Sequence, residues 1–284
     1  MRVLGHTQMD VGASATAAVP PVDLVLVVDQ SGSLEREHAW DDLQRAANDF
    51  VRQFDDGIDQ LGLVSFQIRA TDRVQLGHNF TTPISQALTA MRSAGDTNTG
   101  EGLRLAHEQM QLPAVRQSAA KVVVFFTDGR PTAVRDVIGP PSNRRDRVIA
   151  VTTTVTGRVR GLFNDPDNLP TDVVANPPDY CRNVGNCYGW NENRVRNQGR
   201  VRGEQVARAI RRDGILVYTI GLGNPNNPNP ILQPDLNYLR QLANENGAAH
   251  PNEPQGKMYF APTANDLQAV FDQLARDLFV RLAR

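Results

Sequence analysis

Cysteine is nearly absent from this 284-residue sequence, which contains only Cys181 and Cys187. With no third cysteine and no dense histidine cluster, the pair cannot complete a four-ligand zinc site. A local disulfide closing a loop is the better interpretation, and two unpaired thiols in a flexible loop are the alternative. A disulfide would place the protein outside the cytoplasm.

Long apolar runs and a surplus of either charge are also missing. No segment reaches the length of about 18 apolar residues that a membrane-spanning helix needs. The 30 basic and 31 acidic residues give a net charge of -1, so the basic surplus of nucleic-acid-binding proteins is absent. The first twenty residues end in small side chains, as before a signal-peptidase site, but lack an apolar core. We expect a simple tail there, or a chain from which an anchor has been left out.

Apolar periodicity predicts alternating strands and helices. The fully apolar runs are typical of strands buried on both faces, and the helices carry apolar residues at intervals of three and four. The predicted fold is therefore α/β, a doubly wound and mostly parallel sheet flanked by helices, with one short antiparallel edge strand at 73–80. The other strands are expected at 22–29, 61–66, 121–128, 215–223 and 257–262, and the helices at 37–54, 83–91 (with Pro83 in its first turn), 98–111, 201–212, 234–246 and 265–284.

A region rich in Pro, Asn, Gly and Arg interrupts this alternation at about 131–200. Within it, residues 147–163 alternate like a β-hairpin around Thr156, Gly157 and Arg158. A segment of this length without regular elements is usually functional or disordered. We expect a tail at 1–20 and one domain at 21–284 that carries this region as a long insertion after the fourth strand.

Hydroxyl and carboxylate side chains gather where two apolar strands end. Asp29, Ser31 and Ser33 follow the first strand in "VLVVDQSGS", and Asp128 ends the strand "KVVVFFTD". The carboxyl ends of parallel strands lie at one edge of the sheet, and Gly32 is expected to let the backbone turn tightly between the serines. These are hard oxygen ligands, which suit Mg²⁺ or Mn²⁺ better than zinc.

The "DQSGS" segment resembles the D-x-S-x-S motif of von Willebrand factor type A domains, their metal-ion-dependent adhesion site. "GDTNTGEGL" (95–103) is similar to the family's G-x-T-x-T loop, whose first threonine binds metal and corresponds to Thr97. "FFTDGRP" (125–131) is similar to its strand-end T-D-G, which matches Asp128. All five positions of the site are thus filled. The alternative, in which Asp29 and Ser31 only cap local structure, leaves the other two matches unexplained.

The resemblance implies a binding mechanism. Ser31, Ser33 and Thr97 would touch the metal directly, while Asp29 and Asp128 would act mostly through water. An open coordination position would then accept an Asp or Glu carboxylate from a protein partner. The expected ion is Mg²⁺, with Mn²⁺ or Ca²⁺ as alternatives.

The flanks of the chain narrow the resemblance. Residues 2–34 and 259–284 look like bacterial TadE/TadG-like proteins, which are linked to the assembly of tight-adherence (Flp) pili. In that family a membrane helix precedes an exported von Willebrand A domain. The resemblance implies adhesion or pilus assembly in the periplasm or at the cell surface, with a membrane anchor in a longer form.

Three alternatives to a binding module are an enzyme, a subunit of an ATPase complex and a domain with a purely structural metal. An enzyme with Ser31 as nucleophile needs a neighbouring base; the nearest histidine, His38, is expected on the first helix, and no nucleophile elbow, Walker A loop or dinucleotide fingerprint is present. We therefore expect no enzyme. A cytoplasmic subunit serving an AAA+ ATPase would have the same metal site, and its two cysteines would be free thiols. In a purely structural version, the metal would only stabilise the fold.

Overall fold

The computed structural model describes residues 20–139, 142, 144–151, 158–163, 187–228 and 233–283. Its main sheet has six strands in the order β3-β2-β1-β4-β8-β9. All neighbouring strands are parallel except β3, which pairs antiparallel with β2 at the edge. The predicted α/β architecture is confirmed. The strands are β1 (Val22–Asp29), β2 (Gln60–Phe66), β3 (Ala70–Gly77), β4 (Ala120–Thr127), β8 (Leu216–Leu222) and β9 (Met258–Ala261).

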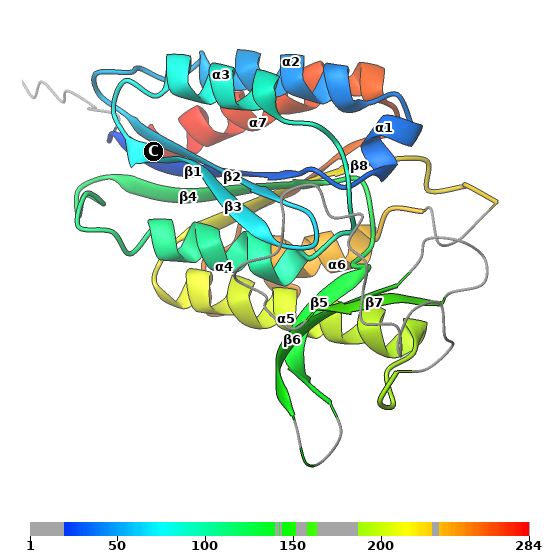
Figure 1. The fold of residues 1–284 in the computed structure, drawn as a ribbon. Helices are drawn as coiled ribbons and strands as arrows, with labels where there is room; N and C mark the ends of the chain where they lie inside the picture. Colours follow the sequence, from blue (N-terminus) through cyan, green and yellow to red (C-terminus); the bar gives the residue numbers. More distant parts are fainter. Residues whose placement is uncertain are drawn as a thin grey trace, which may run out of the picture.

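Helices cover both faces of this sheet (Figure 1). Side chains of β1 alternate between two apolar clusters: Leu24 and Leu26 pack with one helical layer, Val25 and Val27 with the other. Burial on both faces explains why the strand is apolar at every position from Leu24 to Val28. One layer holds α2 (Trp40–Val51), α3 (Thr81–Ala90) and α7 (Leu267–Leu282), and the other holds α4 (Thr99–Gln109), α5 (Glu192–Arg212) and α6 (Leu236–Ala243).

The starts predicted for the first two helices are wrong. The helix expected at 37–54 is α2 and begins only at Trp40, and a separate short helix, α1 (Ser33–Arg36), precedes it. They are separated at His38, which has a left-handed φ of 53°, so His38 lies in a turn and not on the helix. The helix expected at 83 begins at Thr81, because the Asp56 carboxylate accepts hydrogen bonds from the Thr81 amide (3.0 Å) and hydroxyl (2.8 Å).

A small antiparallel sheet follows β4 and lies beside α5 (Figure 1). It consists of β5 (Ala133–Ile138), β6 (Arg145–Val151) and β7 (Val159–Phe163). The β6–β7 pairing confirms the predicted hairpin arms, although its turn lies outside the described residues. The predicted insertion differs at its end, because α5 begins at Glu192 and not at 201.

The small sheet has its own apolar cluster, to which Cys187 and Trp190 contribute. Cys187 is bonded in a disulfide. The partner expected for it, Cys181, lies outside the described residues. The prediction that Cys187 forms a disulfide is therefore confirmed.

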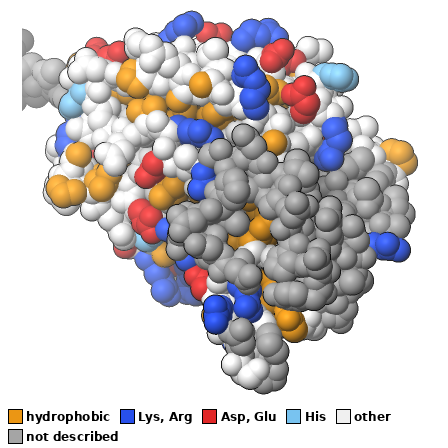
Figure 2. All heavy atoms as spheres, in the orientation of Figure 1, with side chains coloured by type: hydrophobic (Ala, Val, Ile, Leu, Met, Phe, Trp, Pro, Cys, Tyr) orange, Lys and Arg blue, Asp and Glu red, His pale blue; other side chains and the backbone are white. Residues whose placement is uncertain are grey.

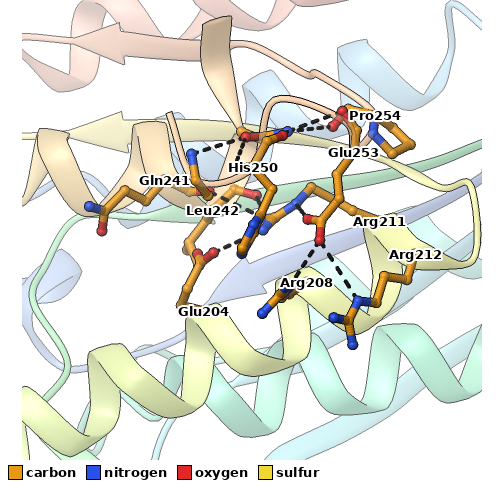
Figure 3. Close-up of polar contacts among 11 residues, drawn as sticks. Glu204, Arg208, Arg211, Arg212, Gln241, Leu242, His250, Glu253 and Pro254 are labelled. Atoms are coloured by element: carbon orange, nitrogen blue, oxygen red, sulfur yellow. Dashed lines mark hydrogen bonds and ion pairs between the residues drawn. The ribbon is translucent and has the colours of Figure 1, made fainter. Parts of the chain in front are cut away.

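A buried arginine ties α5 to the chain between α6 and β9 (Figure 3). The Arg211 side chain is fully buried, with 0% exposure. It donates hydrogen bonds to the Glu253 carboxylate (2.9 Å), to the Glu204 carboxylate (2.8 Å) and to the Leu242 carbonyl (2.7 Å). Because a buried charge is stable only when it is paired and hydrogen-bonded, this cluster fixes the position of α5 relative to α6.

Acidic and basic side chains are interspersed over the described part of the face in Figure 2, in keeping with the balanced charge of the chain. Among the described residues, no helix combines the length and the apolar character needed to cross a membrane.

Candidate functional site

Neighbouring strands bring the two predicted aspartates to the same edge of the sheet. Asp29 is the last residue of β1, and Asp128 follows the last residue of β4, its parallel neighbour. Both side chains are buried. Asp29 accepts hydrogen bonds from the Ser31 amide (2.8 Å) and the Thr127 hydroxyl (2.5 Å). The strand ends therefore hold one carboxylate in a fixed orientation.

The two serines link the aspartates. The Ser31 and Ser33 hydroxyl oxygens are 3.0 Å apart, and Ser33 donates a hydrogen bond to Asp128 Oδ1 at 2.9 Å. Ser33 is the first residue of α1. The structure thus brings Ser31, Ser33 and Asp128 into one chain of polar contacts, as the alternating spacing predicts.

Thr97 approaches the same place from the loop before α4. Its side chain is buried, and among the described residues its hydroxyl makes no hydrogen bond. A Cβ built on Gly129 would lie 4.0 Å from the Thr97 hydroxyl oxygen, so this hydroxyl lies beside the Asp128–Gly129 turn. All five predicted residues therefore meet at one edge of the sheet.

The glycine that the loops require is Gly95 and not Gly32. Gly32 has ordinary helical angles, and an added Cβ would make only normal contacts there. Gly95 has a φ of +83°, and a Cβ would come within 2.0 Å of the Gln67 side-chain oxygen. Its carbonyl accepts the Gly32 amide at 3.2 Å, so the Gly95 turn joins the two loops.

The electrostatics of the site favour a cation. Burial, and then the charge of Asp128, raise the pKa of Asp29 to about 8. Burial raises the pKa of Asp128 to about 6, although the hydrogen bond from Ser33 lowers it. Asp128 Oδ2 is buried with no hydrogen-bond partner among the described residues. An unpaired buried carboxylate oxygen is costly, and a bound cation would offset that cost.

The donor set fits a hard divalent ion. It offers three hydroxyls and two carboxylates, the oxygen ligands that Mg²⁺ and Ca²⁺ take. Among the described residues, this site included, no group of three or more His, Cys, Asp or Glu side chains is arranged to hold a metal, so the hydroxyls would have to supply the remaining protein ligands. The residues present therefore suit an ion held partly through water.

Among the described residues, the serines of the motif contact other hydroxyls, an amide-bound carboxylate and Asp128, and not a histidine. Ser31 contacts Asp29, Ser33 and Ser93, and no histidine among the described residues bonds to either serine of the motif. A serine nucleophile needs a base within hydrogen-bond reach.

Sequence reasoning missed three residues that support the site. Thr127 donates to Asp29, Ser93 donates to the Ser31 carbonyl at 2.6 Å, and Thr132 accepts from the Thr97 amide at 2.8 Å. Thr127 lies in the T-D-G segment and could have been found from it. Ser93 and Thr132 carry no sequence signal, because their contacts depend on how distant loops pack.

The chain matches one family model and is similar to several solved structures. The family model of the von Willebrand factor type A domain matches residues 23–177. The structure is similar to the vWF domain of the type V pili tip protein from Porphyromonas gingivalis, with 18% identity and a TM-score of 0.61 over 94% of this chain and 98% of the other. It is also similar to the PilB minor pilin from Streptococcus sanguinis, with 20% identity and a TM-score of 0.63 over 95% of this chain and 64% of that one.

A third similar structure is proximal thread matrix protein 1 from the mussel byssus with a zinc-occupied MIDAS motif. It is 15% identical, with a TM-score of 0.52, and the alignment covers 93% of this chain and 47% of that chain. At identities this low, the structural similarity shows a shared fold and no more. The chain spans nearly all of the tip-protein domain but less than two thirds of the minor pilin and of the thread protein.

Proposed function

The chain belongs to the von Willebrand factor type A domain family, and on that premise we propose that it is a metal-dependent protein-binding module. A divalent cation, Mg²⁺ or alternatively Mn²⁺ or Ca²⁺, would be held by Asp29, Ser31, Ser33, Thr97 and Asp128. The observation that carries the proposal is the buried Oδ2 of Asp128, which has no hydrogen-bond partner among the described residues and lies close to three hydroxyls from two other loops.

Each residue has a distinct role in this proposal. The three hydroxyls are neutral ligands, so they leave most of the ion's charge uncompensated. Asp29 and Asp128 balance part of that charge, Asp29 from a position fixed by Thr127 and Ser31. When bound, the ion supplies an electropositive coordination position that an Asp or Glu carboxylate of a partner can fill.

The setting we propose is pilus assembly or surface adhesion, outside the cytoplasm, in a TadG-like protein. Support comes from the likeness to a pilus tip protein and a minor pilin. The disulfide at Cys187 adds to it, because such bonds persist in oxidising compartments. The same bond speaks against the second candidate, a cytoplasmic subunit partnering an AAA+ ATPase.

We also propose that the chain is one domain from residue 21 onward, after a tail at 1–20, and that the insertion shapes partner choice. The insertion leaves the sheet directly after Asp128, so it starts at the edge where the metal site lies. Its end is revised to the start of α5 at Glu192. Replacing described surface residues of β5, such as the exposed Val137, should alter partner binding more than stability.

A peptide-display selection on the intact chain tests the proposed function. With millimolar Mg²⁺ during binding and EDTA during elution, the selected peptides should be enriched in Asp and Glu. Replacing the enriched acid by its amide should abolish binding. Enrichment that persists in EDTA, or that contains no acidic residue, would show that the site does not bind carboxylates through a cation.

A further inference from the structure

The backbone of Thr97 is held by Thr132, the residue before β5, and by Ala133, the first residue of β5. The Thr97 amide donates to the Thr132 hydroxyl at 2.8 Å. The Thr97 carbonyl accepts the amides of Thr132 (2.9 Å) and Ala133 (3.1 Å). Both backbone polar groups of this residue are therefore occupied by a segment outside the five-residue motif.

The segment that holds Thr97 is itself fixed on two sides. The Thr132 carbonyl accepts the Val151 amide of β6 at 2.8 Å. Next to it, Pro131 lies against α5 so closely that a Cβ added to Gly199 would be 2.6 Å from the Pro131 Cβ. Residues 131–133 are thus packed between the Thr97 loop, the small sheet and α5.

This arrangement decides where the Thr97 hydroxyl lies. That hydroxyl has no hydrogen bond of its own among the described residues, so its position follows from the backbone. On the other side the loop is anchored at Asn98, whose amide donates to the Gln67 carbonyl at 2.8 Å and whose side chain donates to the Ile68 carbonyl at 3.0 Å. On the β5 side, the Thr132 hydroxyl is the group that accepts the hydrogen bond of the Thr97 amide.

We propose that Thr132 is a positioning residue of the metal site. Because Thr132 also bonds to the small sheet, the position of that sheet would affect the affinity for the cation. This inference rests on the proposed cation site and adds a contact that the five-residue motif does not contain. Groups that orient metal ligands typically change metal affinity by about 10–100-fold when they are removed.

Calorimetric titration of the intact chain with MnCl₂ tests the inference. Thr132→Val removes the hydroxyl at nearly constant size and should raise the Mn²⁺ dissociation constant about tenfold or more. Thr132→Ser keeps the hydroxyl and should bind nearly as wild type does. The matched control is Thr219→Val, because Thr219 is also buried and its hydroxyl donates to the Leu239 carbonyl, away from the site.

A second variant keeps the inference testable if Thr132→Val does not fold. Gly199→Ala improves helix propensity but pushes on Pro131 from α5, so it should also weaken Mn²⁺ binding. Mn²⁺ binding that is unchanged in Thr132→Val and Gly199→Ala, or weakened equally in Thr219→Val, overturns the positioning role alone. Wild-type protein that takes up no Mn²⁺ overturns the proposed function and this inference together.

Discussion

Replacing Asp29 by asparagine should stabilise the metal-free protein at pH 8 and abolish its stabilisation by divalent cations. In the wild type, burial and the neighbouring Asp128 make the ionised form of Asp29 unfavourable. Asparagine keeps an oxygen for the Ser31 amide and removes the charge. The pKa of Asp29 is raised by well over one unit, and each unit corresponds to about 1.4 kcal/mol, so a gain of more than about 1.4 kcal/mol in unfolding free energy is expected in EDTA.

The pH dependence of the metal-free wild type should have the same origin. The pKa of Asp29 rises from 3.8 to about 8 on folding. Between these values the folded state binds more protons than the unfolded state. Unfolding free energy therefore falls as pH rises through this window. Urea unfolding in EDTA should show this decline in wild type and a flatter profile in Asp29→Asn.

Asp23→Asn is the matched control, since Asp23 is equally buried on the same strand. Asp23 is paired with Arg116, whose guanidinium lies within 2.6 Å of the carboxylate. Asp23→Asn should therefore lower stability in EDTA and in Mg²⁺ by the same amount and leave the metal increment intact. A loss of stability in metal-free Asp29→Asn at pH 8, or a metal increment that survives there, would contradict the account of the site.

The largest loss of stability is expected from breaking the Arg211 cluster. Glu253→Ala removes a carboxylate that contacts Arg211 at 2.9 Å and leaves that fully buried guanidinium with Glu204 as its remaining acidic partner. Removing one partner of a buried ion pair typically costs about 3–5 kcal/mol. Urea unfolding should show a loss in that range, and the stabilisation by Mg²⁺ should be unchanged.

Arg212→Ala serves as the control at the same glutamate. Arg212 is 62% exposed and 3.8 Å from Glu253, and exposed ion pairs contribute at most about 1 kcal/mol. Equal losses for Glu253→Ala and Arg212→Ala would mean that burial of Arg211 does not govern the stability of this region.

Much of the fold and of the candidate site could be predicted from local sequence patterns. The apolar runs of β1 and β4 are readable because both faces of these strands are buried. Asp29, Ser31 and Ser33 are readable because they are close in sequence and alternate. Asp128 is predictable because it ends an apolar strand, and the carboxyl ends of parallel strands lie at one edge of the sheet. Thr97 needed the family resemblance, since nothing in its own neighbourhood says that its loop reaches this edge.

The parts that could not be predicted depend on contacts between distant residues. β5 carries Arg135 and Asp136, which do not fit an apolar strand pattern. In the structure Arg135 pairs with Asp146 on β6, and Asp136 pairs with Arg202 on α5. The first half of α5 was not predicted because its many arginines obscure the apolar pattern. Its buried positions Val195, Gly199 and Gly203 nevertheless follow helical spacing.

The central claim is that these five residues form one divalent cation site. The measurement that tests it most directly is a calorimetric titration of the EDTA-treated, dialysed intact chain with MgCl₂, MnCl₂ and CaCl₂, repeated on Asp29→Asn. We predict saturable binding at one site per chain in wild type and none in the variant. No heat of binding with any of the three ions at millimolar concentration, or equal binding by Asp29→Asn, would contradict the claim.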